Sequence, residues 1–177
     1  MTDYIAYAKE CGISEAAAFN PQELPFDDAA ILRQGCEAND CGKYDTNWSC
    51  PPGIGSIEEV ESKVKQWRHG IVMQFLTEAI DSSLQPELFK EISGSFNVMA
   101  RKVFDKVLEE HGDGYMLGRG GCTICKECTY PEKPCRYPEQ MIPCISSHSI
   151  NVYRLWDSTG FRRGNLSETD LYAIILY

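Results

Sequence analysis

Residues 171–177 read LYAIILY, an apolar run of β-prone residues without a polar interruption. A strand that alternates apolar and polar side chains has one face in water, whereas a run that is apolar throughout predicts burial on both faces. We therefore expect this segment to be a central strand of the sheet around which the rest of the chain is arranged.

Two helices upstream of this strand have clear start signals. Ser56 is followed three residues later by Glu59, which is a capping box, and apolar residues then recur on one helical face. Pro86 suits the first position of a helix, and apolar residues at steps of three and four continue to about Glu110. The apolar run 71–76 lies between these helices and predicts a buried strand.

The N-terminal region, residues 1–35, reads as helical with breaks at Pro21 and Pro25. Its alanine-rich segment, residues 15–18, has the composition of a helix because alanine has the highest helix propensity. We therefore expect a short helix there.

The remaining patterns predict a short strand at 115–117 and a further helix at 146–157. Strands that alternate with helices predict a single domain, residues 1–177, of the α/β or α+β class, with a small sheet flanked by helices. Two cysteine-rich segments without an apolar period, at about 36–55 and 118–144, are expected to be loops at one end of the sheet.

The composition bounds the function. A net charge of −9 argues against a general nucleic-acid binder, which needs a basic surface to displace counterions. No apolar stretch approaches the length of a membrane-spanning helix, and the N-terminus lacks the features of a signal peptide, so a cytoplasmic location is expected. In a reducing cytosol, 9 cysteines in 177 residues indicate metal binding or thiol chemistry rather than disulfides.

The sharpest chemical signal is the spacing of Cys122, Cys125 and Cys128, which read C-T-I-C-K-E-C. Three thiolates at this step can occupy three corners of an iron–sulfur cluster, and a ferredoxin-like site takes its fourth ligand from farther along the chain. Cys135 is the candidate for that fourth ligand. The adjacent glycines allow the backbone to approach a bulky inorganic core.

Zinc is the competing metal, but it prefers two paired cysteine hooks around one tetrahedral ion, so the triple step favours iron and sulfide. The match to a bacterial ferredoxin run is incomplete. Six residues separate Cys128 from Cys135, and Arg136 stands where that run has proline. Cys135 could therefore ligate the same cluster as its neighbours or a different one.

The first cysteine segment contains Cys36, Cys41 and Cys50 within fifteen residues. Tyr44 and Trp48 lie between these cysteines and would either shield a metal site from water or pack under the loop. By spacing alone, this segment is a weaker metal signal than the second.

The charged residues near the second group of cysteines have two possible roles. Arg119, Lys126 and Arg136 would either offset the negative charge of a thiolate-ligated cluster or be solvated. His148 lies near the second loop and could be a ligand or a proton donor, although a structural role is favoured. Cys11 lies outside both motifs and is expected to be an ordinary cysteine.

The two segments together, C-x4-C-G-K-Y…N-W-S-C-P-P-G and G-C-T-I-C-K-E-C-T-Y-P-E-K-P-C-R-Y-P, resemble the proteins grouped as domain of unknown function 2284. The resemblance runs from about Cys36 to the C-terminus, and it implies metal binding with no established reaction. The metal ligands implied by the resemblance are Cys36, Cys41, Cys50, Cys122, Cys125, Cys128 and Cys135.

One departure from the family concerns Cys144, which stands where the family pattern has a small polar residue. It is either a spare thiol beside the site or an additional ligand. Seven ligands would complete one 4Fe-4S cluster and leave another with an open iron, whereas eight would complete two. A single cluster could also use four of the cysteines and leave redox-active thiols.

Three functions follow from these ligand counts. The first is electron transfer to a redox partner protein through one or two 4Fe-4S clusters. The second is an enzyme or accessory factor that binds a small-molecule ligand at an open iron. The third is a structural zinc protein. The sequence assigns no catalytic residue.

Overall fold

The structure is a computed structural model that describes residues 2–162, 164–165 and 167–177. Its regular elements within these residues are α1 (Tyr4–Glu10), β1 (Glu15–Phe19), η1 (Pro21–Glu23), α2 (Ala29–Glu37), α3 (Ile57–Lys65), β2 (Gly70–Glu78), α4 (Pro86–His111), β3 (Tyr115–Leu117), η2 (Ser146–His148), η3 (Val152–Leu155), α5 (Trp156–Thr159) and β4 (Glu168–Leu176).

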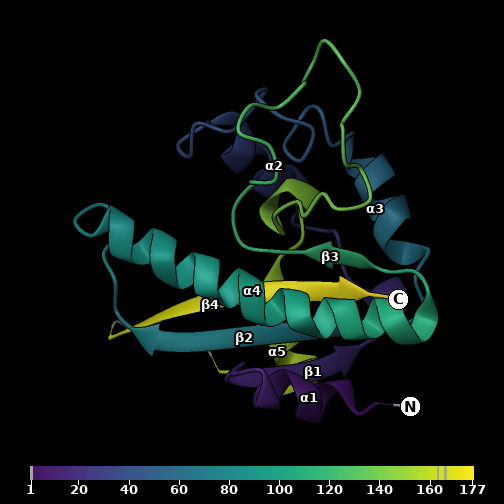
Figure 1. The fold of residues 1–177 in the computed structure, drawn as a ribbon, viewed down its shortest axis with the longest axis vertical. Coiled ribbons are helices and arrows are strands. Elements are labelled where there is room, and N and C mark those ends of the chain that lie inside the picture. The colour runs from purple at the N-terminus through teal and green to yellow at the C-terminus, as the bar shows by residue number, and fades with distance from the viewer. Residues whose placement is uncertain (1, 163, 166) are drawn as a thin grey trace.

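The four strands form one sheet in the order β1-β2-β4-β3. Every pair of neighbouring strands is antiparallel. Helices pack against an antiparallel sheet, so the chain is an α+β protein, which is one of the two classes that the sequence predicts. In Figure 1, α1 and β1 lie at one edge of the sheet, while α2 and α3 gather beyond β3 at the other.

Strand β4 is central, as the apolar run 171–177 predicts. Its odd-numbered residues 171, 173 and 175 belong to a core that α1 and α4 cover. Its even-numbered residues 172, 174 and 176 belong to a second core, which α3 and the segment 145–155 cover. Because successive side chains of a strand point to opposite faces, a strand with two cores must be apolar at every position.

The two predicted helices are confirmed. Ser56 accepts a hydrogen bond from the Glu59 amide and Glu59 accepts one from the Ser56 amide, which closes the capping box at the start of α3. Pro86 occupies the first turn of α4. Gly112 ends α4 in the left-handed region at φ 77°, where its amide donates to the Leu108 carbonyl.

Two predicted helices are wrong. Residues 15–18 belong to strand β1, whose alanines pair with β2 from Met73 to Ile71. A segment this short cannot hold a helix on its own propensity, and pairing with β2 satisfies its backbone instead. Residues 146–157 instead form the short 3-10 helices η2 and η3 and the first residues of α5, because Ser149 has φ 55° and interrupts a continuous helix.

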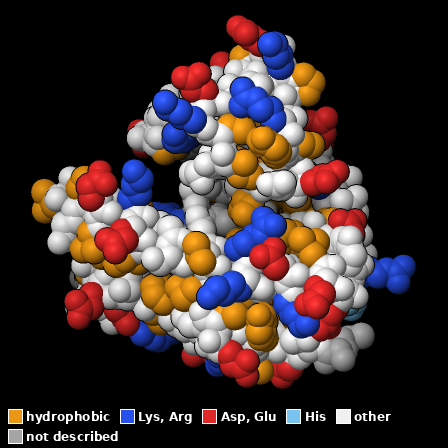
Figure 2. Space-filling model, in the orientation of Figure 1, with side chains coloured by type: hydrophobic (Ala, Val, Ile, Leu, Met, Phe, Trp, Pro, Cys, Tyr) orange, Lys and Arg blue, Asp and Glu red, His pale blue; other side chains and the backbone are white. Residues whose placement is uncertain are grey.

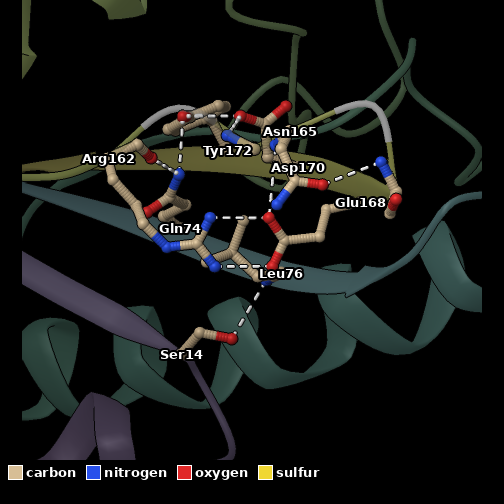
Figure 3. A network of polar contacts seen from close by, with 10 residues as sticks. Ser14, Gln74, Leu76, Arg162, Asn165, Glu168, Asp170 and Tyr172 are labelled. Carbon is tan, nitrogen blue, oxygen red and sulfur yellow. Dashed lines mark hydrogen bonds and ion pairs between the residues drawn. The ribbon is translucent and has the colours of Figure 1, made fainter.

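The segment before β4 is anchored to the sheet by polar contacts (Figure 3). Gln74 is fully buried in β2 and donates from Nε2 to the Arg162 carbonyl at 2.7 Å and to the Tyr172 hydroxyl at 2.8 Å. Asp170 accepts from the Gly164 amide at 2.9 Å. These bonds hold the connection against the face of the sheet and lead the chain into the central strand.

Candidate metal centre

The first cysteine segment begins inside a helix rather than in a loop. Cys36 lies in the last turn of α2, whereas residues 36–55 were all expected to be irregular. Cys41 is exposed in the turns that follow, and Cys50 is buried. The Asn39 side chain accepts from the Tyr44 amide at 2.9 Å, which folds the stretch between the cysteines back on itself.

The second cysteine segment has neither helix nor regular strand between residues 118 and 144. Its two ends meet in an isolated bridge between Gly118 and Cys144, and the Gly118 amide donates to the Pro143 carbonyl at 2.9 Å. Arg136 donates to the Glu127 carbonyl at 2.9 Å across the middle of the segment. The second segment is therefore a closed loop that is tied at its base.

The two cysteine segments interlock. The Ser49 hydroxyl accepts from the Cys122 amide at 3.0 Å, and the Trp48 indole donates to the Lys133 carbonyl at 3.0 Å. The Tyr130 hydroxyl donates to Asp45 at 2.7 Å, and its ring meets Trp48 edge-on with centroids 4.9 Å apart. These contacts join segments that are about eighty residues apart in the sequence into one structural unit.

Four cysteines of the second segment share one pocket, which Trp48, Ser49 and Met141 also line. We call these four cysteines the loop set: Cys122, Cys125, Cys128 and Cys135. The pocket thus places Cys135 beside the three cysteines of the C-x2-C-x2-C run. Trp48 lines the pocket together with the loop set, while Tyr44 is not among the residues lining it.

The four other cysteines of the two segments are not among the residues that line this pocket. We call them the split set, because they come from three separate parts of the chain: Cys36, Cys41, Cys50 and Cys144. Burial raises the pKa of Cys36, and the neighbouring thiols of the same set raise it further, Cys144 most strongly. Burial likewise raises the pKa of Cys50, and the charges of Cys144 and Cys41 add to the effect.

Arg33 lies beside the split set, and no cysteine spacing pointed to it. It donates to the Gly55 carbonyl at 2.9 Å and to the Ser147 carbonyl at 3.3 Å. Its positive charge opposes the effect of burial on the pKa of Cys36. Arg33 stands three residues before Cys36 on α2, and this spacing, which puts both on one helical face, is the sequence signal that could have found it.

Arg119 is a second cation near the split set. Its backbone is held by Asn97 of α4, which accepts from the Arg119 amide at 3.1 Å and donates to its carbonyl at 3.0 Å. The guanidinium lies 4.9 Å from the centre of the Phe89 ring. Burial lowers the pKa of Arg119, and a negative charge on Cys144 is the strongest influence in the opposite direction.

His148 is fully buried and held from two sides. Its Nε2 lies 2.9 Å from the Tyr115 hydroxyl and its Nδ1 lies 3.3 Å from the Ser147 hydroxyl. Burial lowers the pKa of His148 to about 3, so the ring is neutral near pH 7. Cys11 packs against the core under α1 and α4, on the far face of the sheet from the split set.

All nine cysteines are free thiols. Among the described residues, no three side chains of His, Cys, Asp or Glu lie close enough together to hold one metal ion. Within the same part of the chain, no helix is both long and apolar enough to cross a membrane. Figure 2 shows Lys and Arg interspersed with Asp and Glu over the face that includes the cysteine loops.

The sequence matches the family model described as "Predicted metal-binding protein (DUF2284)" over residues 17–177. The chain belongs to this family. The DUF2284 match begins within β1 and includes both cysteine segments, so it extends farther toward the N-terminus than the resemblance from Cys36 onward. As a DUF2284 member, the protein is a predicted metal-binding protein. No curated protein and no solved structure matches the chain.

Proposed function

We propose that this protein binds a 4Fe-4S cluster through the loop set and passes electrons to a redox partner protein. The observation that carries the proposal is that Cys122, Cys125, Cys128 and Cys135 line one pocket. A C-x2-C-x2-C run with a fourth cysteine beside it is the ligand arrangement of ferredoxin-type sites.

The surroundings of the pocket suit a cluster. Ser49 holds the Cys122 amide, and Trp48 forms an apolar wall over the loop set. Apolar walls and hydrogen bonds near the ligands tune the reduction potential of an iron–sulfur centre by limiting access of water. The loop carries no regular structure, so its thiols can close around the cluster as it binds.

The roles of the protein in electron transfer follow from these contacts. The bound cluster supplies the one-electron chemistry, and the chain holds it, limits its exposure to water and presents it at the surface. Cys128 is exposed, which gives a partner protein a short path to the loop set. The free thiols of the set must remain reduced to ligate metal, which fits a reducing cytoplasm.

The test is to purify the protein without oxygen, record its visible spectrum and assay iron, sulfide and zinc. We expect a brown protein with iron and sulfide in equal amounts. Cys128→Ser should lose about four irons per chain. The matched control is Cys11→Ser, which changes a cysteine on the far face of the sheet and should keep all the iron. A colourless wild-type protein with stoichiometric zinc and no sulfide would overturn the proposal.

A further inference from the structure

We infer that the split set forms a second, separate metal site that holds its own 4Fe-4S cluster, with Cys144 as the eighth cysteine ligand of the protein. The identity of the metal rests on the proposed function of the loop set. The division of the eight cysteines into two groups of four rests on the structure of the split set.

Cys36 and Cys144 each form a hydrogen bond with the same peptide group. The Cys36 thiol donates to the Ser146 carbonyl at 3.7 Å, and the Ser147 amide donates to Cys144 Sγ at 3.3 Å. That carbonyl and that amide belong to the same peptide bond. Because this peptide bond is trans, its carbonyl and amide point in opposite directions, and the two sulfur atoms lie on either side of one peptide group that links the end of α2 to the base of the second loop.

Cys50 lies against the start of the second loop, close to the base where Gly118 bridges to Cys144. A Cβ on Gly121 would lie 3.5 Å from Cys50 Sγ, so the backbone of the second loop passes directly beside this sulfur atom. The Ile54 amide donates to the Cys50 carbonyl at 3.0 Å and fixes the turn that carries the thiol. Cys50 is buried, so its sulfur faces the protein and not water.

The pocket separates the same two groups. It is lined by all four cysteines of the loop set and by no member of the split set. Cys41, which lies between Cys36 and Cys50 in the chain, is therefore assigned to the split set. The eight cysteines of the two segments thus fall into two groups of four.

Two cations balance the charge of the split set. Four thiolates and a cluster core carry net negative charge, and burying that charge is costly without a counter-charge. Arg33 reaches the set from α2, and Arg119 reaches it from the start of the second loop. Both guanidinium groups are held by contacts that would position them before any metal binds.

The number of cysteine ligands decides what each cluster can do. With seven ligands, one cluster would keep an open iron and could bind a substrate. With Cys144 as the eighth, every iron has a cysteine and the protein is built for electron transfer alone. The sets are also adjacent, because Gly121 lies beside Cys50 and the next residue, Cys122, belongs to the loop set.

The test compares Cys144→Ser and Cys36→Ser with Cys128→Ser and the Cys11→Ser control. Wild type should contain about eight irons and eight sulfides per chain, and each of the first three variants should lose about half. The double variant Cys36→Ser/Cys144→Ser should lose no more than either single variant, whereas Cys36→Ser/Cys128→Ser should lose nearly all. A Cys144→Ser protein with full iron and an EPR spectrum identical to wild type would overturn the inference.

A measurement on the wild-type protein covers the case in which a variant does not fold. Iodoacetamide labelling followed by mass spectrometry should find Cys144 protected together with Cys36, Cys41 and Cys50, and all four labelled after the metal is chelated. Labelling of Cys144 in the metal-loaded protein would contradict the inference.

Failure of the proposed function gives a different result. If wild type contains two zinc ions and no sulfide, the iron–sulfur proposal is wrong. In that case, loss of one zinc in Cys144→Ser and of the other in Cys128→Ser would still support the division into two sites.

Discussion

The loop set and the split set differ in how the chain assembles them. The loop set comes from fourteen consecutive residues, 122–135, and needs only the local folding of one loop. The split set needs α2, the turn at Cys50 and the base of the second loop to meet. A metal site made of adjacent residues tolerates a loosened scaffold, whereas one assembled from distant segments depends on tertiary packing. Four measurements test this difference between the two sets.

The largest expected effect comes from the core beneath the split set. Ile174 of β4 is fully buried and packs in the core with Ile145 and Ile150, which follow Cys144. Ile174→Ala should lower the free energy of unfolding by about 2 to 5 kcal/mol. Iron of the split set should be lost at a lower denaturant concentration than in wild type, while iron of the loop set should be affected less.

The matched control is Ile175→Ala, the same change at an equally buried residue on the opposite face of β4. It should lower the free energy of unfolding by a similar amount, measured by urea denaturation. It should not cause selective loss of iron from the split set. If Ile174→Ala and Ile175→Ala release iron from the two sets to the same extent, then the split set does not depend on the core on its own side of the sheet.

The second largest effect is expected at low pH, where the free energy of unfolding should fall on the side of the sheet that carries the split set. His148 has a pKa of about 3 when folded against 6.5 for the free side chain, so the unfolded chain binds a proton first. This contribution to stability is intact above pH 6.5 and is lost as the pH falls toward 3. The expected loss is about 3 kcal/mol by pH 4.

Hydrogen exchange between pH 7 and pH 4 measures this effect. Amides at 144–155 should lose protection before amides at 122–135. His148→Gln, which can still bond Tyr115 but does not titrate, should flatten the pH dependence. An unchanged slope in the variant would show that other groups cause it.

A smaller effect is expected from Arg33. Arg33→Met leaves the Gly55 and Ser147 carbonyls without their donor and should cost about 1 to 3 kcal/mol. It should also weaken metal retention by the split set during chelator challenge. Arg101→Met, which removes an ion pair with Asp105 on α4, is the control and should cost less than about 1 kcal/mol.

The smallest effect concerns reduction potential. Arg119→Met removes a buried positive charge near Cys144, so adding an electron to the split set becomes less favourable. The potential should fall by tens of millivolts, on the order expected for one charge at partial burial. Lys126→Met removes an exposed charge between Cys125 and Cys128 and should shift the reduction potential less, because water and salt screen it. EPR-monitored titration of both variants makes the comparison.

The sequence alone was sufficient for features whose causes are local. The capping box at Ser56, the proline start of α4 and the uninterrupted run at 171–177 each depend on neighbouring residues, so their structures could be predicted. The C-x2-C-x2-C run is local in the same sense, and its spacing already indicated a metal site.

Tertiary structure decided the features that depend on distant partners. Residues 15–18 became a strand because β2 supplied the hydrogen bonds that a short helix could not provide. In the sequence Cys144 is an isolated departure from a family pattern, and only the fold places it and Cys36 on either side of the peptide group between Ser146 and Ser147. Spacing describes only what adjacent residues can do together, and the split set is made by residues that meet only when the chain folds.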